Sequence, residues 1–251
     1  VTDKAGNESD PSDPVEITVD TSGPAAPKAP EQFVDNEGND PTNTDFGTET
    51  NDQTPGIIVG PMVDGETPKL YVDGKEVEST YDPETGTLTP TTPLEEGKHD
   101  ITYTVTDKAG NESDPSDPVE ITVDTSAPDH TVEITKIIDN EELVVGDVAT
   151  GGFSNDKSPT LEGTLSKALA AGEKVIVIRA TDGKDPVEID ATVSDSTWTV
   201  TDTLVDDATY TYTAVVVDAA GNRSPVSNSY SMTVDTSAPD HTVEITKIID
   251  N

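Results

Sequence analysis

HDITYTVT, the stretch His99–Thr106, alternates core-forming and polar side chains and decides the fold of this chain. Successive side chains of an extended strand point to opposite faces, so alternation over seven or more residues predicts a half-buried β-strand. The residues that share the inward face are His99, Ile101, Tyr103 and Val105. The same pattern recurs once, at Tyr210, Tyr212, Ala214 and Val216.

A long repeat extends outward from this strand. Residues 1–22, VTDKAGNESDPSDPVEITVDTS, recur letter for letter at 105–126. Residues 122–140 likewise recur at 233–251, so the repeated unit has the length of a small domain. We therefore expect four pieces: the C-terminal fragment of a preceding repeat, two whole repeats, and the N-terminal fragment of a following one. Their predicted bounds are 1–20, 21–124, 125–235 and 236–251.

Short strands and turns fill the rest of each repeat. Asp73-Gly74 is a strong hairpin signal between Lys69–Val72 and Glu76–Glu78. Further strands are predicted at 175–178, 198–200 and 229–234. Leu165–Ala171 has a helical pattern but is too short to form a stable helix alone. About seven strands per repeat predict an all-β chain, with tandem antiparallel immunoglobulin-like β-sandwiches in a linear array.

Composition excludes several classes of function. Lys and Arg number 14 against 51 Asp and Glu, and the net charge of -37 argues against nucleic acid as a partner. No apolar run approaches the roughly 20 residues that span a bilayer, so we expect no direct membrane insertion. The absence of Cys excludes disulfides and zinc-thiolate sites. Alternating burial explains why only 31% of the residues are hydrophobic, and disorder is the weaker interpretation.

Four motifs carry a resemblance to a known family. They are VDTS-[AG]-P, an Asp-Asn pair that ends the first strand, ND-x-[ST]-P before the second, and D-x-AGN-x-S before the last. This set resembles the bacterial immunoglobulin-like repeats of giant, calcium-stiffened, type I-secreted surface adhesins. The first repeat departs slightly, with Lys108 where Ala219 stands in the second. The chain begins without Met, and we expect it to be a segment of a longer protein.

The resemblance implies an extracellular location at the bacterial cell surface. It implies a stalk segment whose partners are the neighbouring repeats of the same chain and a distal adhesive domain. Calcium at the linkers between repeats would hold successive domains in line.

Catalysis has little support in the residues. The histidines are His99, His130 and His241, and His99 takes the place of Tyr210 on a core-facing row. No Ser, His and acid arrangement recurs in both repeats, and no glycine-rich phosphate loop is present. Trp198 aligns with Leu88 and is predicted to be a core residue, not a sugar-stacking platform. We therefore expect that this protein is not an enzyme.

Oxygen-bearing motif residues point instead to Ca²⁺, which prefers hard oxygen ligands. The spacing from Asp35-Asn36 to Asn51-Asp52 is repeated from Asp139-Asn140 to Asn155-Asp156, although the intervening sequences are unrelated. In a sandwich the end of the first strand, the start of the second and the end of the last meet at the end where the chain leaves the domain. The D-x-AGN turn lies at the opposite end. The candidate metal ligands are Asp35, Asn36, Asp52, Asp107, Asn111, Asp124, Asp139, Asn140, Asp156, Asp218, Asn222 and Asp235.

Other interpretations stay open. A solvated acidic surface accounts for acids such as Asp10, Asp13, Asp190 and Asp195. A ligand-binding module that contacts host glycan or protein would need an exposed aromatic cluster, and the sequence shows none. An accessory sandwich of a secreted polysaccharide-active enzyme would need a catalytic neighbour outside this segment.

Overall fold

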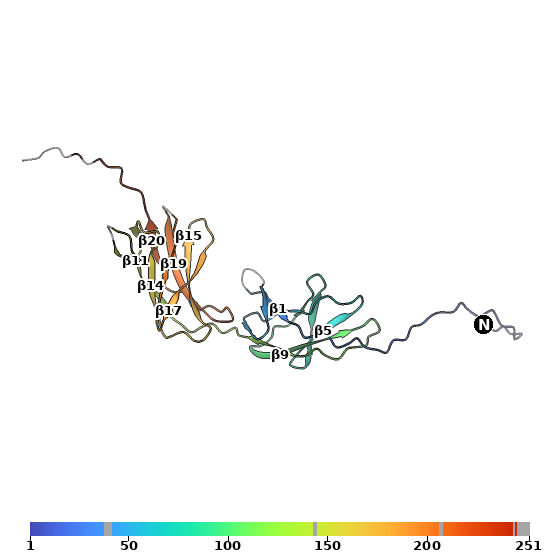
Figure 1. Ribbon diagram of the computed structural model, residues 1–251. Helices are drawn as coiled ribbons and strands as arrows, with labels where there is room; N and C mark the ends of the chain where they lie inside the picture. The colour runs from blue at the N-terminus through green and yellow to red at the C-terminus, as the bar shows by residue number, and fades with distance from the viewer. Residues whose placement is uncertain (38–41, 143–144, 206–207, 243, 245–251) are drawn as a thin grey trace, which may run out of the picture. The chain divides into compact units, whose positions relative to one another are not determined.

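The computed structural model describes residues 1–37, 42–142, 145–205, 208–242 and 244 (Figure 1). Within these residues every regular element is a β-strand, which confirms the predicted all-β fold. The chain divides into two compact units, Val1–Gly47 with Asp52–Thr122 and Thr48–Asn51 with Val123–Asn251. Half of the predicted C-terminal fragment 236–251, namely 243 and 245–251, lies outside the described residues.

The first sandwich consists of two five-stranded sheets with the orders β2-β1-β4-β8-β7 and β3-β10-β9-β5-β6. Its apolar core includes Phe33, Ile57, Leu70, Leu88, Ile101 and Ile121, each at most 1% exposed. The strands are β1 (Gln32–Asp35), β2 (Thr42–Asp45), β3 (Glu49–Thr50), β4 (Gly56–Ile58), β5 (Thr67–Val72), β6 (Lys75–Val77), β7 (Ser79–Asp82), β8 (Thr87–Pro90), β9 (Gly97–Thr106) and β10 (Val119–Val123).

The second sandwich repeats this topology strand for strand, as β12-β11-β14-β18-β17 and β13-β20-β19-β15-β16. Its core includes the buried side chains of Ile137, Leu161, Trp198, Tyr212 and Met232. The strands are β11 (Val132–Asp139), β12 (Gly146–Val148), β13 (Gly152–Ser154), β14 (Thr160–Leu165), β15 (Lys174–Thr181), β16 (Val187–Asp190), β17 (Thr192–Ser194), β18 (Thr197–Thr201), β19 (Thr209–Val217) and β20 (Tyr230–Val234).

The strands that the sequence predicts from alternation lie at the centre of their sheets. In β9, Ile101, Tyr103 and Val105 are buried, and His99 is half-buried on the same face. The hairpin at Asp73-Gly74 is also confirmed, since β5 pairs with β6 around it. Both turn residues have positive φ, 52° at Asp73 and 73° at Gly74, as a two-residue type I′ turn requires.

The segment Leu165–Ala171, predicted to be too short for a stable helix, forms no helix in the structure, because Leu165 pairs with Val132 in the sheet and is buried there. One detail of the sequence analysis is wrong. The alignment of Trp198 with Leu88 is two residues out of register. Leu88 pairs with Ile57, and Leu161, the counterpart of Ile57 in the second sandwich, pairs with Val200, so Val200 is the counterpart of Leu88. The predicted burial of Trp198 is nevertheless confirmed, at 2% exposure.

Candidate functional site

Three of the predicted acidic residues of the second sandwich gather around one buried serine. The Ser154 hydroxyl donates to Asp139 Oδ2 at 2.7 Å and accepts from the Asp156 backbone N at 3.0 Å. The Ser154 carbonyl accepts from the Asp235 backbone N at 2.9 Å. Asp139 and Asp156 are 1% and 0% exposed, so the ends of three strands and two buried carboxylates meet at this point.

Hydrogen bonds explain the repeated spacing between the Asp-Asn and Asn-Asp pairs. Asp156 Oδ2 accepts from the Asn140 backbone N at 2.8 Å, and Asp52 Oδ2 accepts from the Asn36 backbone N at 2.9 Å. The other oxygen of each carboxylate accepts from a backbone N two residues further on, at 2.7 Å in both cases. Each carboxylate therefore joins the end of the first strand to the start of the second, whatever sequence lies between them.

The Asp residues at strand ends close local turns. In each, one carboxylate oxygen accepts from the backbone N two residues on at 2.9 to 3.0 Å, the pattern of an Asx-turn. These residues are Asp35, Asp124, Asp139 and Asp235. The Asp124 backbone N also donates to the Thr50 carbonyl at 2.9 Å, which matches the bond from Asp235 to Ser154.

The D-x-AGN loops close on themselves. Asp107 Oδ1 accepts from the Asn111 backbone N at 2.9 Å, and Asp107 Oδ2 accepts from the Asn111 side-chain amide at 3.0 Å. Asp218 and Asn222 form the same two bonds at 2.8 and 3.0 Å. The hydrogen bond from Asn111 and the backbone donors together hold the pKa of Asp107 below its usual value. These carboxylates are thus structural acceptors within their own loops.

A third copy of the loop shows that its shape comes from local sequence. Asp3 and Asn7 lie in an exposed segment, yet Asp3 accepts from the Asn7 backbone N and side-chain amide, both at 2.9 Å. The Asn7 side chain is again the leading cause of a lowered pKa for Asp3. The loop therefore closes without the support of packed strands.

The D-x-AGN loop of each sandwich also binds the chain segment that precedes that sandwich. Asn111 Nδ2 donates to the Asp20 carbonyl at 3.2 Å, and Asn222 Nδ2 donates to the Asp124 carbonyl at 2.7 Å. Asp20 and Asp124 occupy the same place in the repeated VDTS motif. We call this repeated bond the Asn tie. It joins a carboxylate-closed loop to the backbone just before the Pro-containing linker.

The donor set has the chemical character that calcium requires. A carboxylate has about four acceptor positions, so one or two bonds from N–H groups leave oxygen lone pairs for a cation. Asp139 and Asp156 are both buried, and among the described residues neither is paired with Lys or Arg. No group of three or more acids or histidines in the described part of the chain is already arranged to hold a metal ion.

Ser154 and its counterpart Thr50 are site residues that the sequence analysis missed. Thr50 is fully buried at the end of β3, as Ser154 is nearly so at the end of β13. Both stand directly before an Asn-Asp pair. That shared hydroxyl is the signal that could have identified them.

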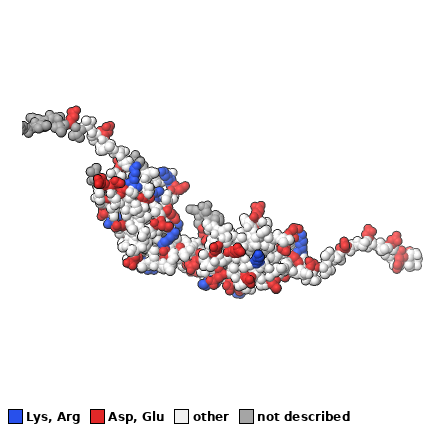
Figure 2. Space-filling model, viewed as in Figure 1, with Lys and Arg blue, Asp and Glu red and all other residues white. Residues whose placement is uncertain are grey.

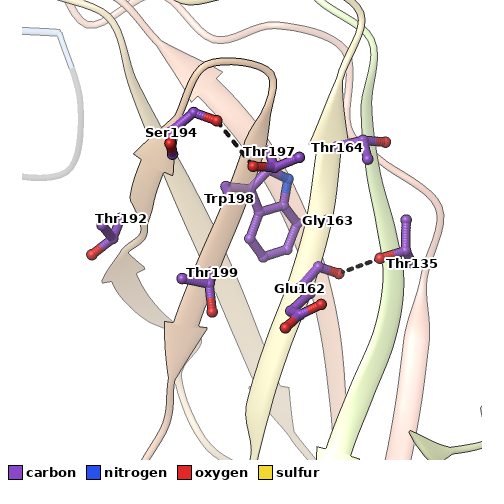
Figure 3. Close-up of a pocket in the computed structure, with 9 residues that line it drawn as sticks. All are labelled: Thr135, Glu162, Gly163, Thr164, Thr192, Ser194, Thr197, Trp198 and Thr199. Atoms are coloured by element: carbon purple, nitrogen blue, oxygen red, sulfur yellow. Dashed lines mark hydrogen bonds between the residues drawn. The ribbon is translucent and has the colours of Figure 1, made fainter.

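The remaining surface is acidic or hydroxyl-rich. Figure 2 shows carboxylates spread over the visible face of both sandwiches, with fewer basic side chains between them. A groove of about 380 Å³ on the second sandwich is lined mainly by Thr and Ser hydroxyls (Figure 3). Trp198 lies at this groove, but its ring belongs to the core, as the sequence predicted.

The fold and the carboxylate-closed loops that recur in both sandwiches define a modular all-β protein made of tandem immunoglobulin-like domains. The chain belongs to the bacterial Ig-like domain family, whose model matches residues 29–125 and 131–236. Domains of this type are typically non-catalytic structural or accessory modules and are usually extracellular. Within the described residues no helix has the length and apolar character to cross a membrane.

Solved structures with similarity to the chain come from several bacteria. The fibronectin(III)-like modules of Clostridium thermocellum CbhA are 14% identical, with a TM-score of 0.46 over 85% of this chain and 100% of that chain. Dimeric latent PorU from Porphyromonas gingivalis is 17% identical, with a TM-score of 0.29 over 91% of this chain and 22% of that chain. A search of curated proteins finds no match.

Proposed function

We propose that the chain is a stalk segment of a bacterial cell-surface adhesin, which holds a distal adhesive domain away from the cell. The observation that carries this proposal is the Asn tie. Asn111 and Asn222 make the same bond to the carbonyl of the Asp that precedes each linker. The same bond in both repeats attaches the segment before each linker to the loop in the same way, as expected of a spacer built from copied units. The letter-for-letter repeats support the same proposal, because a spacer can be lengthened by copying.

Calcium is the proposed stiffening ion of this stalk. In one joint the ligands would come from Asp35, Asp52 and Asp124, and in the next from Asp139, Asp156 and Asp235. The amide or backbone oxygens of Asn36 and Asn140 would add to these sets. The loop residues Asp107, Asn111, Asp218 and Asn222 would contribute from the side of the following repeat.

Electrostatics supports a cation at these positions. Two carboxylates about 4 Å apart repel by about 1 kcal/mol in water and by more when water is excluded. The Ser154 hydroxyl contacts the Asp139 carboxylate and the Asp156 backbone N, and both Asp residues are almost fully buried. When bound, a divalent ion would offset the repulsion between carboxylates that approach one another and would bind oxygen atoms of different segments.

Calorimetric titration with Ca²⁺ tests the ligand assignment. Asp52→Asn and Asp156→Asn are expected to lose one class of sites each, while the double variant loses both. Asp10→Asn is the matched control, because Asp10 lies in the exposed N-terminal segment. Unchanged binding by the double variant would show that these carboxylates are turn residues only.

Spin-label distances test the stalk itself. The chain has no Cys, so single Cys substitutions at the exposed Glu84 and Asp185 place one label on each sandwich. Calcium is expected to narrow the distance distribution, and a chelator is expected to broaden it again. A distribution of equal width in both states would exclude calcium stiffening, and a broad one in both states would exclude a stalk.

A further inference from the structure

The first sandwich has a histidine where the second has a tyrosine that closes a corner. Val72 pairs with Ile101 in β5 and β9, and Arg179 pairs with Tyr212 in β15 and β19. Counting back two residues along β9 and β19 places His99 and Tyr210 at the same position. The side chain of His99 is 13% exposed, and Tyr210 is 1% exposed.

The loops before these two strands also correspond. The Leu94 backbone N donates to the Gln53 carbonyl, and the Leu204 backbone N donates to the Lys157 carbonyl, both at 2.8 Å. Because Asp52 and Asp156 precede these acceptors at matching positions, the two leucines are equivalent. The residues that follow them, Glu95 and Val205, are therefore equivalent as well.

Both corner residues bind the carbonyl of that equivalent residue. Tyr210 donates its hydroxyl hydrogen to the Val205 carbonyl at 2.5 Å and accepts from the Val205 backbone N at 3.0 Å, which is a tyrosine corner. His99 Nε2 lies 2.8 Å from the Glu95 carbonyl. His99 Nδ1 lies 2.8 Å from Asp73 Oδ2, in the β5–β6 turn. The histidine thus joins two loops, whereas the tyrosine holds one.

The number of ring protons decides whether His99 can make both contacts. A carbonyl oxygen and a carboxylate oxygen only accept hydrogen bonds, so each ring nitrogen must carry a hydrogen. A neutral imidazole has one N–H, and only the imidazolium has two. The observed geometry is therefore fully satisfied by the protonated ring alone.

The charges around the ring favour that protonated form. The charges of Asp73 and Glu95 raise the pKa of His99. The charge of Lys75 lowers the pKa of Asp73, and the Asp100 backbone N donates to Asp73 Oδ1. Burial lowers the pKa of His99, but its bonds to Asp73 and to the Glu95 carbonyl outweigh this and raise it above its usual 6.5. The bond from His99 is the main cause of a lowered pKa for Asp73.

We propose that His99 makes the first sandwich responsive to pH, because loss of its second ring proton releases one of the two loops that it joins. At the corresponding corner of the second sandwich, Tyr210 makes its single tie through a hydroxyl group, so that corner has no imidazole to lose a proton. The inference concerns the interior of one domain and is independent of the proposed stalk function and its calcium sites.

The direction of the effect follows from the two pKa shifts. A raised pKa means that the stabilisation from His99 is complete below pH 6.5 and is lost as the pH rises through the folded-state pKa. A lowered pKa means that the stabilisation from Asp73 is present above its usual 3.8 and is lost as the pH falls through the folded-state pKa. Each unit by which the folded-state pKa of His99 exceeds the unfolded value changes the unfolding equilibrium up to tenfold.

Nuclear magnetic resonance of the full chain tests the proposal through the ring nitrogens of His99. His241, in the exposed C-terminal segment, is the internal reference. His99 is expected to hold both ring protons to a higher pH than His241 does. Asp73→Asn should lower the protonation midpoint of His99, and Asn tolerates the positive φ at this position. A midpoint for His99 at or below that of His241 would overturn the proposal.

A stability measurement gives the second readout. Hydrogen exchange of the β9 amides in the wild-type chain is expected to accelerate between pH 6 and pH 9 by more than the intrinsic rate does. His99→Tyr, which copies the corner of the second sandwich, should abolish this excess, and the exchange of the β19 amides should be the same in both proteins. The same excess in His99→Tyr as in the wild type would contradict the proposal.

Discussion

The two sandwiches share one topology but fill the same interior position with opposite chemistry. In the second, Arg179 Nη1 lies 2.6 Å from Asp202 Oδ1, and the Tyr212 hydroxyl donates to Asp202 Oδ2 at 2.9 Å. Burial, followed by the Asp202 charge, raises the pKa of Tyr212, which therefore stays protonated. Sheet pairing places three apolar residues at the corresponding positions of the first sandwich: Val72, Pro90 and Ile101.

This difference separates what the fold requires from what it tolerates. The carboxylates that close turns and join strand ends are the same in both repeats, since they satisfy backbone N–H groups in fixed places. Side-chain groups between the sheets can be charged or apolar, provided that a buried charge is paired. The backbone-binding residues are therefore the better guide to the fold, and the interior networks distinguish one repeat from another.

Removal of one member of the charged group should produce the largest effect. Asp202→Ala removes the carboxylate from the buried Tyr212 hydroxyl and from the Arg179 guanidinium, whose side chain is 18% exposed, which is expected to cost about 3–5 kcal/mol of unfolding free energy. Urea unfolding followed by the fluorescence of Trp198, the single tryptophan, reports on the second sandwich alone. Asp190→Ala is the control, because the Asp190 side chain is 73% exposed.

Replacement of all three residues, Arg179, Asp202 and Tyr212, tests whether the charged interior of the second sandwich can be exchanged for the apolar interior of the first. The triple variant Arg179→Val, Asp202→Val and Tyr212→Ile makes the three positions apolar, as they are in the first sandwich, and keeps the Asp202 backbone N–H that donates to the Pro159 carbonyl at 3.1 Å. Apolar replacement of a buried ionic group is often neutral or stabilising, so the triple variant should recover most of the loss caused by Asp202→Ala. A triple variant no more stable than the single one would show that the two interiors are not interchangeable.

A smaller effect is expected where the two sandwiches differ in backbone packing. A Cβ atom at Gly163 would lie 2.2 Å from both the Glu133 carbonyl and the Trp198 ring, so Gly163→Ala should cost about 1–3 kcal/mol. At Gly56, in β4 of the first sandwich, the nearest atom is 3.4 Å away. Gly56→Ala should be within about 1 kcal/mol of neutral or stabilising. Urea unfolding measures the loss of stability of Gly163→Ala, and hydrogen exchange measures that of Gly56→Ala in the first sandwich. Equal losses of stability in the two variants would contradict this explanation.

The smallest predicted effect concerns an exposed network of the first sandwich. Glu112 accepts from Lys69, Tyr71 and Thr104, and the bond from Lys69 is the leading cause that lowers its pKa from 4.5 to about 2. The stabilisation is present above pH 4.5 and is lost as the pH falls towards 2.

Solvent access limits this contribution to under about 1 kcal/mol. Glu112→Gln should therefore reduce the loss of stability of the first sandwich on acidification, as measured by hydrogen exchange of β9. In the second sandwich Arg223 stands at the position of Glu112 and pairs with Glu188, so that position has no acid to protonate. An unaltered acid response of Glu112→Gln would remove Glu112 from the explanation.

Local patterns predicted much of this structure, and long-range pairing accounts for the failures. Alternation identified β9 and β19, and the Asp73-Gly74 turn identified the β5–β6 hairpin. The position of Trp198 was misassigned because strand register depends on which residue of β14 it faces. The Arg179–Asp202–Tyr212 group joins β15 and β19 to the residue that follows β18, so no single stretch of sequence displays it. The conserved spacing correctly linked Asn140 to Asp156, but Ser154 became visible only when the ends of three strands were brought together. The repeat boundaries and the calcium ligands stay predictions.

The self-closing D-x-AGN loop has a consequence for how an array of near-identical repeats folds. Adjacent domains with the same strand sequences can exchange strands, which is a typical route to misassembly in repeat proteins. The bonds of the loop span only four residues, as at Asp3 and Asn7, so they close early and at little entropic cost. The D-x-AGN loop connects β9 to β10 and β19 to β20. When this loop forms first, it directs the last strand of each domain back to the preceding strand of the same domain. Local closure thereby favours native pairing over exchange while the chain emerges.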